Sequence, residues 1–100
     1  MTVAEAMKKM ILLSNGNRHD INHFLKVHAY VAAIGACEGL PEDTLQTLEL
    51  AAIVHDIACP LCREKYGNTN GNYQQLEGAP LTRDFFAGTD IPADQLERIV

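Results

Sequence analysis

Apolar residues near the N-terminus recur every three or four positions, which is the spacing of one face of a helix. Thr2 and Glu5 form the S/T-x-x-E pattern typical of a helix N-terminus. We therefore predict a first helix that runs to about Leu13, followed by a turn over residues 14–17 in which Gly16 takes a positive φ. The apolar stripe of this helix consists of Val3, Met7, Met10 and Ile11.

Two longer helices follow, joined by a short connection. The second has a wide apolar face, and we expect Asp20 to cap its start and Gly39 with Pro41 to end it. The third opens at Pro41 with acidic residues in its first turn, where the helix dipole favours them. It becomes apolar nearly all round over residues 50–58 and should end before Pro60. Its second half is therefore expected at the centre of the fold.

The rest of the chain predicts a long loop and two more helices. Residues 59–73 show no clear period and are rich in turn formers, which indicates a loop. A fourth helix is predicted from about Tyr73 to a stop at Gly88, with Pro80 kinking it or starting its main segment. A fifth helix should begin at Asp90 or its neighbour. No segment alternates as a strand does, so we predict an all-α bundle of about five helices.

The organisation expected from this pattern is a single domain over residues 1–100. Residues 1–17 form its N-terminal helix and turn, and residues 18–100 form its core. The apolar stripe of the fifth helix is still running at Val100, without a stop signal. We therefore expect the chain to be an N-terminal portion of a longer gene product.

The composition is that of a soluble globular protein, with 47% hydrophobic and 21% charged residues. A net charge of −5 argues against duplex nucleic acid as a partner, because that binding needs a basic surface. Residues 1–13 place Glu5 and two lysines among apolar positions, which fits neither a signal peptide nor a membrane span. We expect a cytoplasmic protein without a membrane partner. The unfinished apolar stripe would suit a homo-oligomer, in which a second copy covers it.

The dipeptide His55-Asp56 interrupts the apolar third helix. An imidazole and a carboxylate are costly inside a domain unless they are hydrogen-bonded, neutralised or bound to a metal. Adjacent side chains point about 100° apart around a helix, so these two can bracket one ion. Backbone carbonyls and the end of the helix could satisfy them instead.

A third donor is available on the second helix. His23 lies on its inward side, and the short connection brings the second and third helices together as a hairpin. Two imidazoles and a carboxylate suit Zn, Mn, Fe, Co or Ni rather than Ca. His23 also fits a histidine that is simply packed at the edge of the core. His19 and His23 form a rival pair at i, i+4, but His19 precedes the expected cap at Asp20.

These residues resemble a known family. His23-x-x-x-Val27 on one helix, followed about thirty residues later by His55-Asp56 at the end of an apolar helix, is similar to the HD superfamily of metal-dependent phosphohydrolases. The resemblance covers residues 18–100. It implies an HD-domain-like helical bundle in which His23, His55 and Asp56 bind one divalent transition metal. A further Asp on a later helix completes the metal site in that family.

The resemblance continues in a later helix and has three departures. Glu77-Gly78-Ala79, with hydrophobic residues after it, is similar to the helix that follows the active-site loop in the family. Residues 57–59 lack the polar helper that many members carry after the His-Asp pair. Gln74 stands where members with two metals have a further His, which favours a single metal. No Asp occurs at the position of the final ligand, which would follow Val100.

The resemblance implies hydrolysis of a small phosphate ester, such as a nucleotide. A metal-activated water would be the nucleophile, and Asp56 would orient it. Arg18, Arg63 and Lys65 flank the expected site and could bind the phosphate, while Glu77 could accept a hydrogen bond from a metal ligand. Each of these four also fits an ordinary solvated side chain.

Two other functions fit the same residues. One is a non-catalytic HD-type helical module in which any metal is structural or regulatory, and the absent helper and final Asp favour it. The other is a thiol switch at Cys59-Pro-Leu-Cys62. A structural zinc site there would need four ligands, and the sequence offers no second C-x-x-C and no nearby C-x-x-H.

Overall fold

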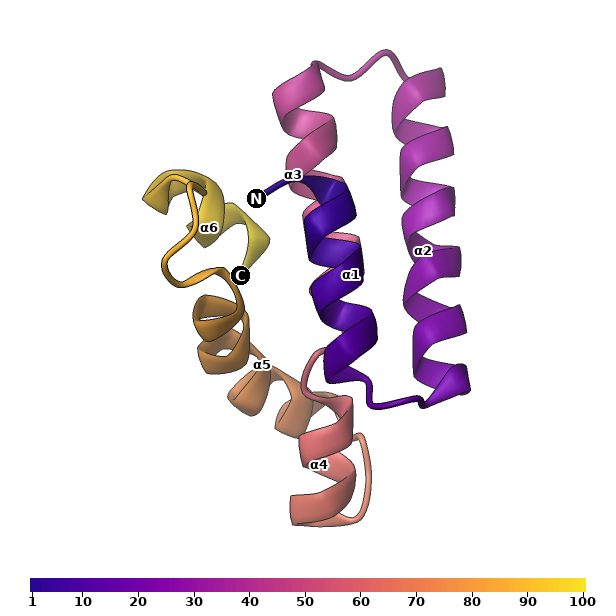
Figure 1. Cartoon of the computed structure of the whole chain (residues 1–100), viewed down its shortest axis with the longest axis vertical. Helices are drawn as coiled ribbons and strands as arrows, with labels where there is room; N and C mark the ends of the chain where they lie inside the picture. The colour runs from indigo at the N-terminus through magenta and orange to yellow at the C-terminus, as the bar shows by residue number, and fades with distance from the viewer.

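The computed structural model describes all 100 residues, which form six helices and no strand. The all-α class predicted from the sequence is therefore confirmed. Figure 1 shows α1, α2 and α3 running alongside one another, with α5 and α6 on the other side of α3. In chain order the helices are α1 (Val3–Leu13), α2 (Arg18–Cys37), α3 (Glu42–Val54), α4 (Cys59–Tyr66), α5 (Gly71–Phe86) and α6 (Ala93–Ile99).

Helix α3 is the centre of the fold, as its apolar second half predicts. It packs against α1, α2 and α6. Leu50 and Ile53 have no exposed surface, and Val54 has almost none. A helix that is apolar on most of its circumference reaches a stable position only when neighbours cover it on several sides. The remaining members of the main core cluster are Ala6, Met10, Phe24, Phe85, Phe86 and Ile99.

The starts of the first two helices show how short polar side chains set the chain direction. Thr2 and Glu5 form the predicted capping box, and Gly16 has a φ of +79°. The expectation that Asp20 caps α2 is wrong. Asn17 is the cap, and its side chain accepts a hydrogen bond of 3.0 Å from the backbone N–H of Asp20. The helix therefore begins three residues earlier than an Asp20 cap would place it, and Asp20 lies inside its first turn.

The expectation of a long loop over residues 59–73 is also wrong, because the first half of this range forms α4. Pro60 occupies the first turn of this helix, where its missing N–H leaves no hydrogen bond unmade. The proline thus starts a helix as well as ending the previous one. The connection that remains is short, and it is closed by the stacked rings of Tyr66 and Tyr73, whose centroids are 3.9 Å apart.

The boundaries of the other helices differ from expectation by a few residues. Helix α3 ends at Val54 rather than near Pro60, so Asp56 lies in a turn between α3 and α4. Helix α5 contains Pro80 in its interior, and Pro92 rather than Asp90 precedes the first turn of α6.

The chain has the dimensions of a single small domain. Its radius of gyration is 13.4 Å, close to the value of about 13 Å typical of 100 residues. The stretch Glu42–Tyr66, which comprises α3, the turn and α4, is long and apolar enough to cross a membrane by length and composition alone. Within it, 44% of the most apolar window is buried inside the fold, and the core helix of a soluble protein has the same properties.

Candidate metal centre

The α2–α3 hairpin brings His23 against the pair His55-Asp56. His23 Nε2 lies 3.2 Å from His55 Nε2 and 2.9 Å from Asp56 Oδ2. His55 Nε2 lies 3.1 Å from the same carboxylate oxygen. These three residues form the group of side chains in the structure whose donor atoms converge closely enough to hold one ion.

The size of this triangle fits a first-row divalent ion. Nitrogen and oxygen ligands lie about 2.1 Å from such an ion, so two donors at right angles to each other are about 3.0 Å apart. The three separations at the site, 3.2, 2.9 and 3.1 Å, agree with that value. The donor set of two imidazoles and one carboxylate is also of the type that binds zinc, iron, manganese, cobalt or nickel.

The hydrogen bond made by Nδ1 of His55 determines which ring nitrogen carries the proton. His55 Nδ1 lies 2.6 Å from the carbonyl oxygen of Ala52, and a carbonyl can only accept a hydrogen bond. Nδ1 therefore carries the proton, and in the neutral ring Nε2 keeps its lone pair. That lone pair lies 3.2 Å from His23 Nε2 and 3.1 Å from Asp56 Oδ2, so it is directed at the point where a cation could bind. Metal-bound histidines commonly hold their other ring nitrogen in this way.

The donors stand at the edge of the core and are supported from within. Phe24 follows His23 on α2 and is buried, and Ile53 precedes the pair on α3 and is fully buried. The three donor side chains themselves remain 31–45% exposed. The site is therefore anchored by the core and open to solvent.

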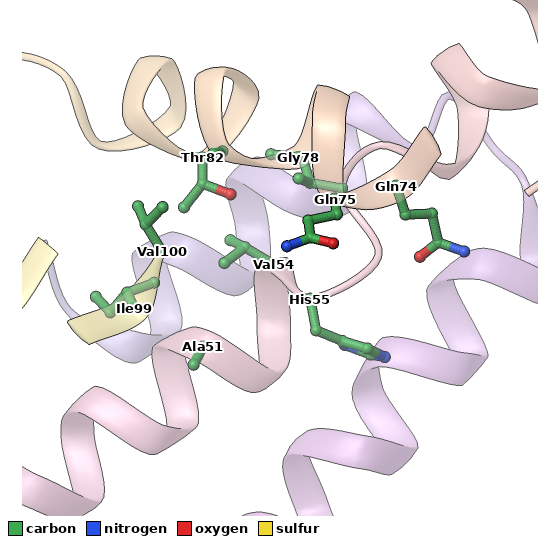
Figure 2. A pocket seen from close by; sticks show the side chains of 11 residues that line it. Ala51, Val54, His55, Gln74, Gln75, Gly78, Thr82, Ile99 and Val100 are labelled. Carbon is green, nitrogen blue, oxygen red and sulfur yellow. The ribbon is translucent and has the colours of Figure 1, made fainter. Parts of the chain in front are cut away.

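A cleft of about 610 Å³ begins at His55 and runs between α3 and α5 towards the end of α6. Figure 2 shows His55 at one end of it and Ile99 with Val100 at the other. Gln74 and Gln75 supply polar groups to its α5 wall. The rest of the lining is mainly small or apolar, and it consists of Ala51, Val54, Ile57, Gly78, Ala79 and Thr82.

Two of the three cations expected to bind phosphate are engaged by carboxylates. Arg63 on α4 forms an ion pair with Asp20 on α2, and this contact raises the pKa of the Arg63 guanidinium. Lys65 forms an ion pair of 2.8 Å with Glu77. Arg18 is exposed at the start of α2 and forms none of the ion pairs in the structure.

Glu77 links α5 to α4 and not to the metal centre. Its Oε1 accepts hydrogen bonds from Lys65 Nζ at 2.8 Å and from the Tyr66 hydroxyl at 2.7 Å. These two donors hold the pKa of the Glu77 carboxyl below its usual value. Glu77 forms no hydrogen bond with His23, His55 or Asp56, so it does not support a metal ligand in the way that the sequence suggested.

The two cysteines of the C-x-x-C segment lie in the first half of α4 and are both buried. Burial, reinforced by the negative charge of Asp56, raises the pKa of the Cys59 thiol to about 11. A protonated and buried thiol is a poor nucleophile. The arrangement therefore has the character of two packed thiols.

Two contributors to the site were missed in the sequence. Asp20 was assigned to a helix cap, whereas its carboxylate holds Arg63 across 43 residues of chain. A carboxylate three positions before His23 on the same helix was the signal that could have found it. The carbonyl of Ala52, which orients His55, has no signal in the sequence because every residue carries one.

Comparisons with known proteins give no match for this chain among protein-family models, curated proteins or solved structures.

Proposed function

We propose that this chain is a metal-dependent phosphohydrolase of the HD type that acts on a small phosphate ester, such as a nucleotide. The observation that carries the proposal is the convergence of His23, His55 and Asp56 on one point. Their order and spacing resemble the ligands of that superfamily, and their chemistry suits a single Mn, Fe, Co, Ni or Zn ion. The orientation of His55 by the carbonyl of Ala52 supports the same conclusion.

His23, His55 and Asp56 would hold the divalent ion, which would supply a water of lowered pKa and offset charge on the phosphate oxygens. The side chains of Asp56 and His55 would orient the water and the metal ligand, respectively. The close contacts of Asp56 with both histidines use Oδ2, so Oδ1 is available to accept a hydrogen bond from the attacking water. His55 keeps its Nε2 directed at the centre because its Nδ1–H is held by the backbone.

Recognition of the phosphate group would begin at Arg18, because this guanidinium has no carboxylate partner. Arg63 and Lys65 would have to be shared with Asp20 and Glu77, respectively. Arginine retains further N–H donors when it is paired on one side, so Arg63 can still contact an anion.

The pairing of Arg63 and Lys65 also favours a second candidate function. A non-catalytic HD-type module would need the metal centre but no free cations, and two of the three expected cations are neutralised by neighbouring carboxylates. In that case the ion would contribute to stability or regulation by binding only the folded chain.

The first experiment compares the parent chain with His55→Ala and Asp56→Asn. Metal content after purification and turnover of a panel of phosphate esters are measured for each. We expect the parent to hold about one transition ion per chain and to hydrolyse at least one ester, and both variants to lose the metal and the turnover. The matched control is His28→Gln, because His28 is a histidine outside the centre that is hydrogen-bonded to Glu49.

The results separate the two candidate functions. Metal that raises the thermal midpoint of the parent but not of the two variants, with no turnover on any ester, would select the non-catalytic module. A parent chain that binds no metal and behaves like the two variants would refute both.

A further inference from the structure

His19 lies one helical turn before His23 on the same face of α2. Because Asn17 is the cap, the helix begins at Arg18 and His19 belongs to its first turn. Residues at i and i+4 of a helix have Cβ atoms only about 5–6 Å apart. The two imidazoles are stacked, with centroids 6.5 Å apart and planes within 7° of parallel. The position of the cap thus places a third imidazole beside the metal centre.

No hydrogen bond holds the His19 side chain away from the centre. It is 91% exposed, and its nearest charged partner is Asp20, with 3.7 Å between Nδ1 and Oδ1. That separation is too long for a hydrogen bond, so the ring can turn without breaking one. His28 is different, because Glu49 holds its Nε2 at 3.1 Å and its side chain is 15% exposed. His19 is therefore the histidine outside the triad that is free to move.

The centre can accept another donor on this side. His23 is 45% exposed, and three protein ligands at right angles to one another leave further positions of a six-coordinate ion open. Two histidines spaced i, i+4 on one helix are a recurring way of binding a single zinc ion. We infer that His19 is a fourth protein ligand of this centre, which gives three imidazoles and one carboxylate. The inference rests on the metal site of the proposed function and not on its hydrolytic activity.

A fourth ligand bears directly on what the site can do. With His19 bound, a six-coordinate ion at this centre would have at most two positions left for water and substrate.

The test is a titration with Co²⁺ alone, monitored through its visible absorption bands, which respond to the number and type of ligands. The proteins are the whole parent chain, His19→Ala, His23→Ala and Asn22→Ala. Asn22 is the matched control, because it is an exposed polar residue on α2 that carries no metal donor nitrogen. Circular dichroism checks that each variant is folded, and the exposure of His19 makes loss of the fold in His19→Ala unexpected.

We expect His19→Ala to bind Co²⁺ at least about tenfold more weakly than Asn22→Ala, since even residues that only support a ligand change affinity by that factor. Its absorption bands should also shift, because water replaces a nitrogen donor. Identical affinity and bands in His19→Ala and Asn22→Ala would overturn this inference alone, provided that His23→Ala no longer binds. Absence of Co²⁺ binding by the parent would overturn the inference and the proposed function together.

Discussion

The two nitrogens of His55 have different tasks. Nδ1 donates a hydrogen bond to the carbonyl of Ala52, and this leaves Nε2 as a lone-pair donor 3.2 Å from the corresponding atom of His23. A single residue therefore links the backbone of the central helix to the candidate metal centre. Asp20 also links two elements through one side chain, because its carboxylate fixes the position of Arg63. At this scale, function depends on which atom of a side chain is already engaged.

The cysteines give a prediction at the residue scale. Cys37 is exposed, whereas Cys59 and Cys62 are buried. The pKa of Cys59 rises from 9.0 to about 11, so its reactive thiolate fraction at pH 8 is about a hundredfold smaller than that of an ordinary thiol. We expect a thiol reagent at pH 8 to label Cys37 rapidly in the folded chain and all three cysteines in denaturant.

Peptide mass mapping of the labelled chain identifies the modified residues. Rapid labelling of Cys59 or Cys62 without denaturant would contradict the prediction. It would also restore the thiol switch as a serious hypothesis, because such a switch needs an accessible and ionisable thiol.

At the scale of elements, the contact between α2 and α3 positions the candidate centre, and Gly35 sets how closely the two helices approach. A Cβ on Gly35 would lie 2.4 Å from Leu45 Cδ1, which is too short for two carbon atoms. Gly35→Val therefore has to push the helices apart or displace Leu45. We expect it to lower the free energy of unfolding by about 1–3 kcal/mol in urea denaturation, the usual cost of overpacking.

Ala33→Val is the matched control for this change. Ala33 is exposed on the same helix, so its variant carries the cost of a β-branched residue in a helix without the steric conflict. Because valine is a better helix former than glycine and a poorer one than alanine, unchanged or increased stability in Gly35→Val would show that the close approach at Gly35 has no energetic consequence.

The elements also show which boundaries the sequence could predict. The start of α1 was predicted correctly, because Thr2 and Glu5 satisfy each other's backbone groups within one turn. Helix α4 was not predicted, because Pro60 can end one helix or begin the next, and the local sequence does not distinguish these two roles. The cap of α2 was misplaced for a similar reason, since Asn17 and Asp20 are both good caps and only one can be used.

At the scale of the whole molecule, the small core makes stability sensitive to single changes. Only 17 of 100 residues are buried, and Ile53 is among the four largest that are fully buried. We expect Ile53→Ala to lower the free energy of unfolding by about 2–5 kcal/mol, the range for removing a large aliphatic side chain from a core. A domain of this size has a total stability of only about 5–15 kcal/mol, so the loss should be visible in a thermal melt.

Leu12→Ala is the control for the same measurement, because Leu12 is 70% exposed although it is equally hydrophobic. Its melting temperature should stay close to that of the parent. A similar decrease for Leu12→Ala and Ile53→Ala would mean that α3 is not the centre of the core.

The sequence by itself determined the all-α class, the central place of α3 and the three donor residues of the candidate centre. These follow from local patterns, namely helical spacing of apolar residues and polar groups that an apolar helix cannot leave unpaired. Only the tertiary structure decided that His23 meets His55 and Asp56 at 3 Å, that Arg63 pairs with Asp20, and that His19 stacks on His23. The physical reason is that side-chain pairing depends on distances between helices and on competition among nearby partners, which the order of residues along one chain does not specify.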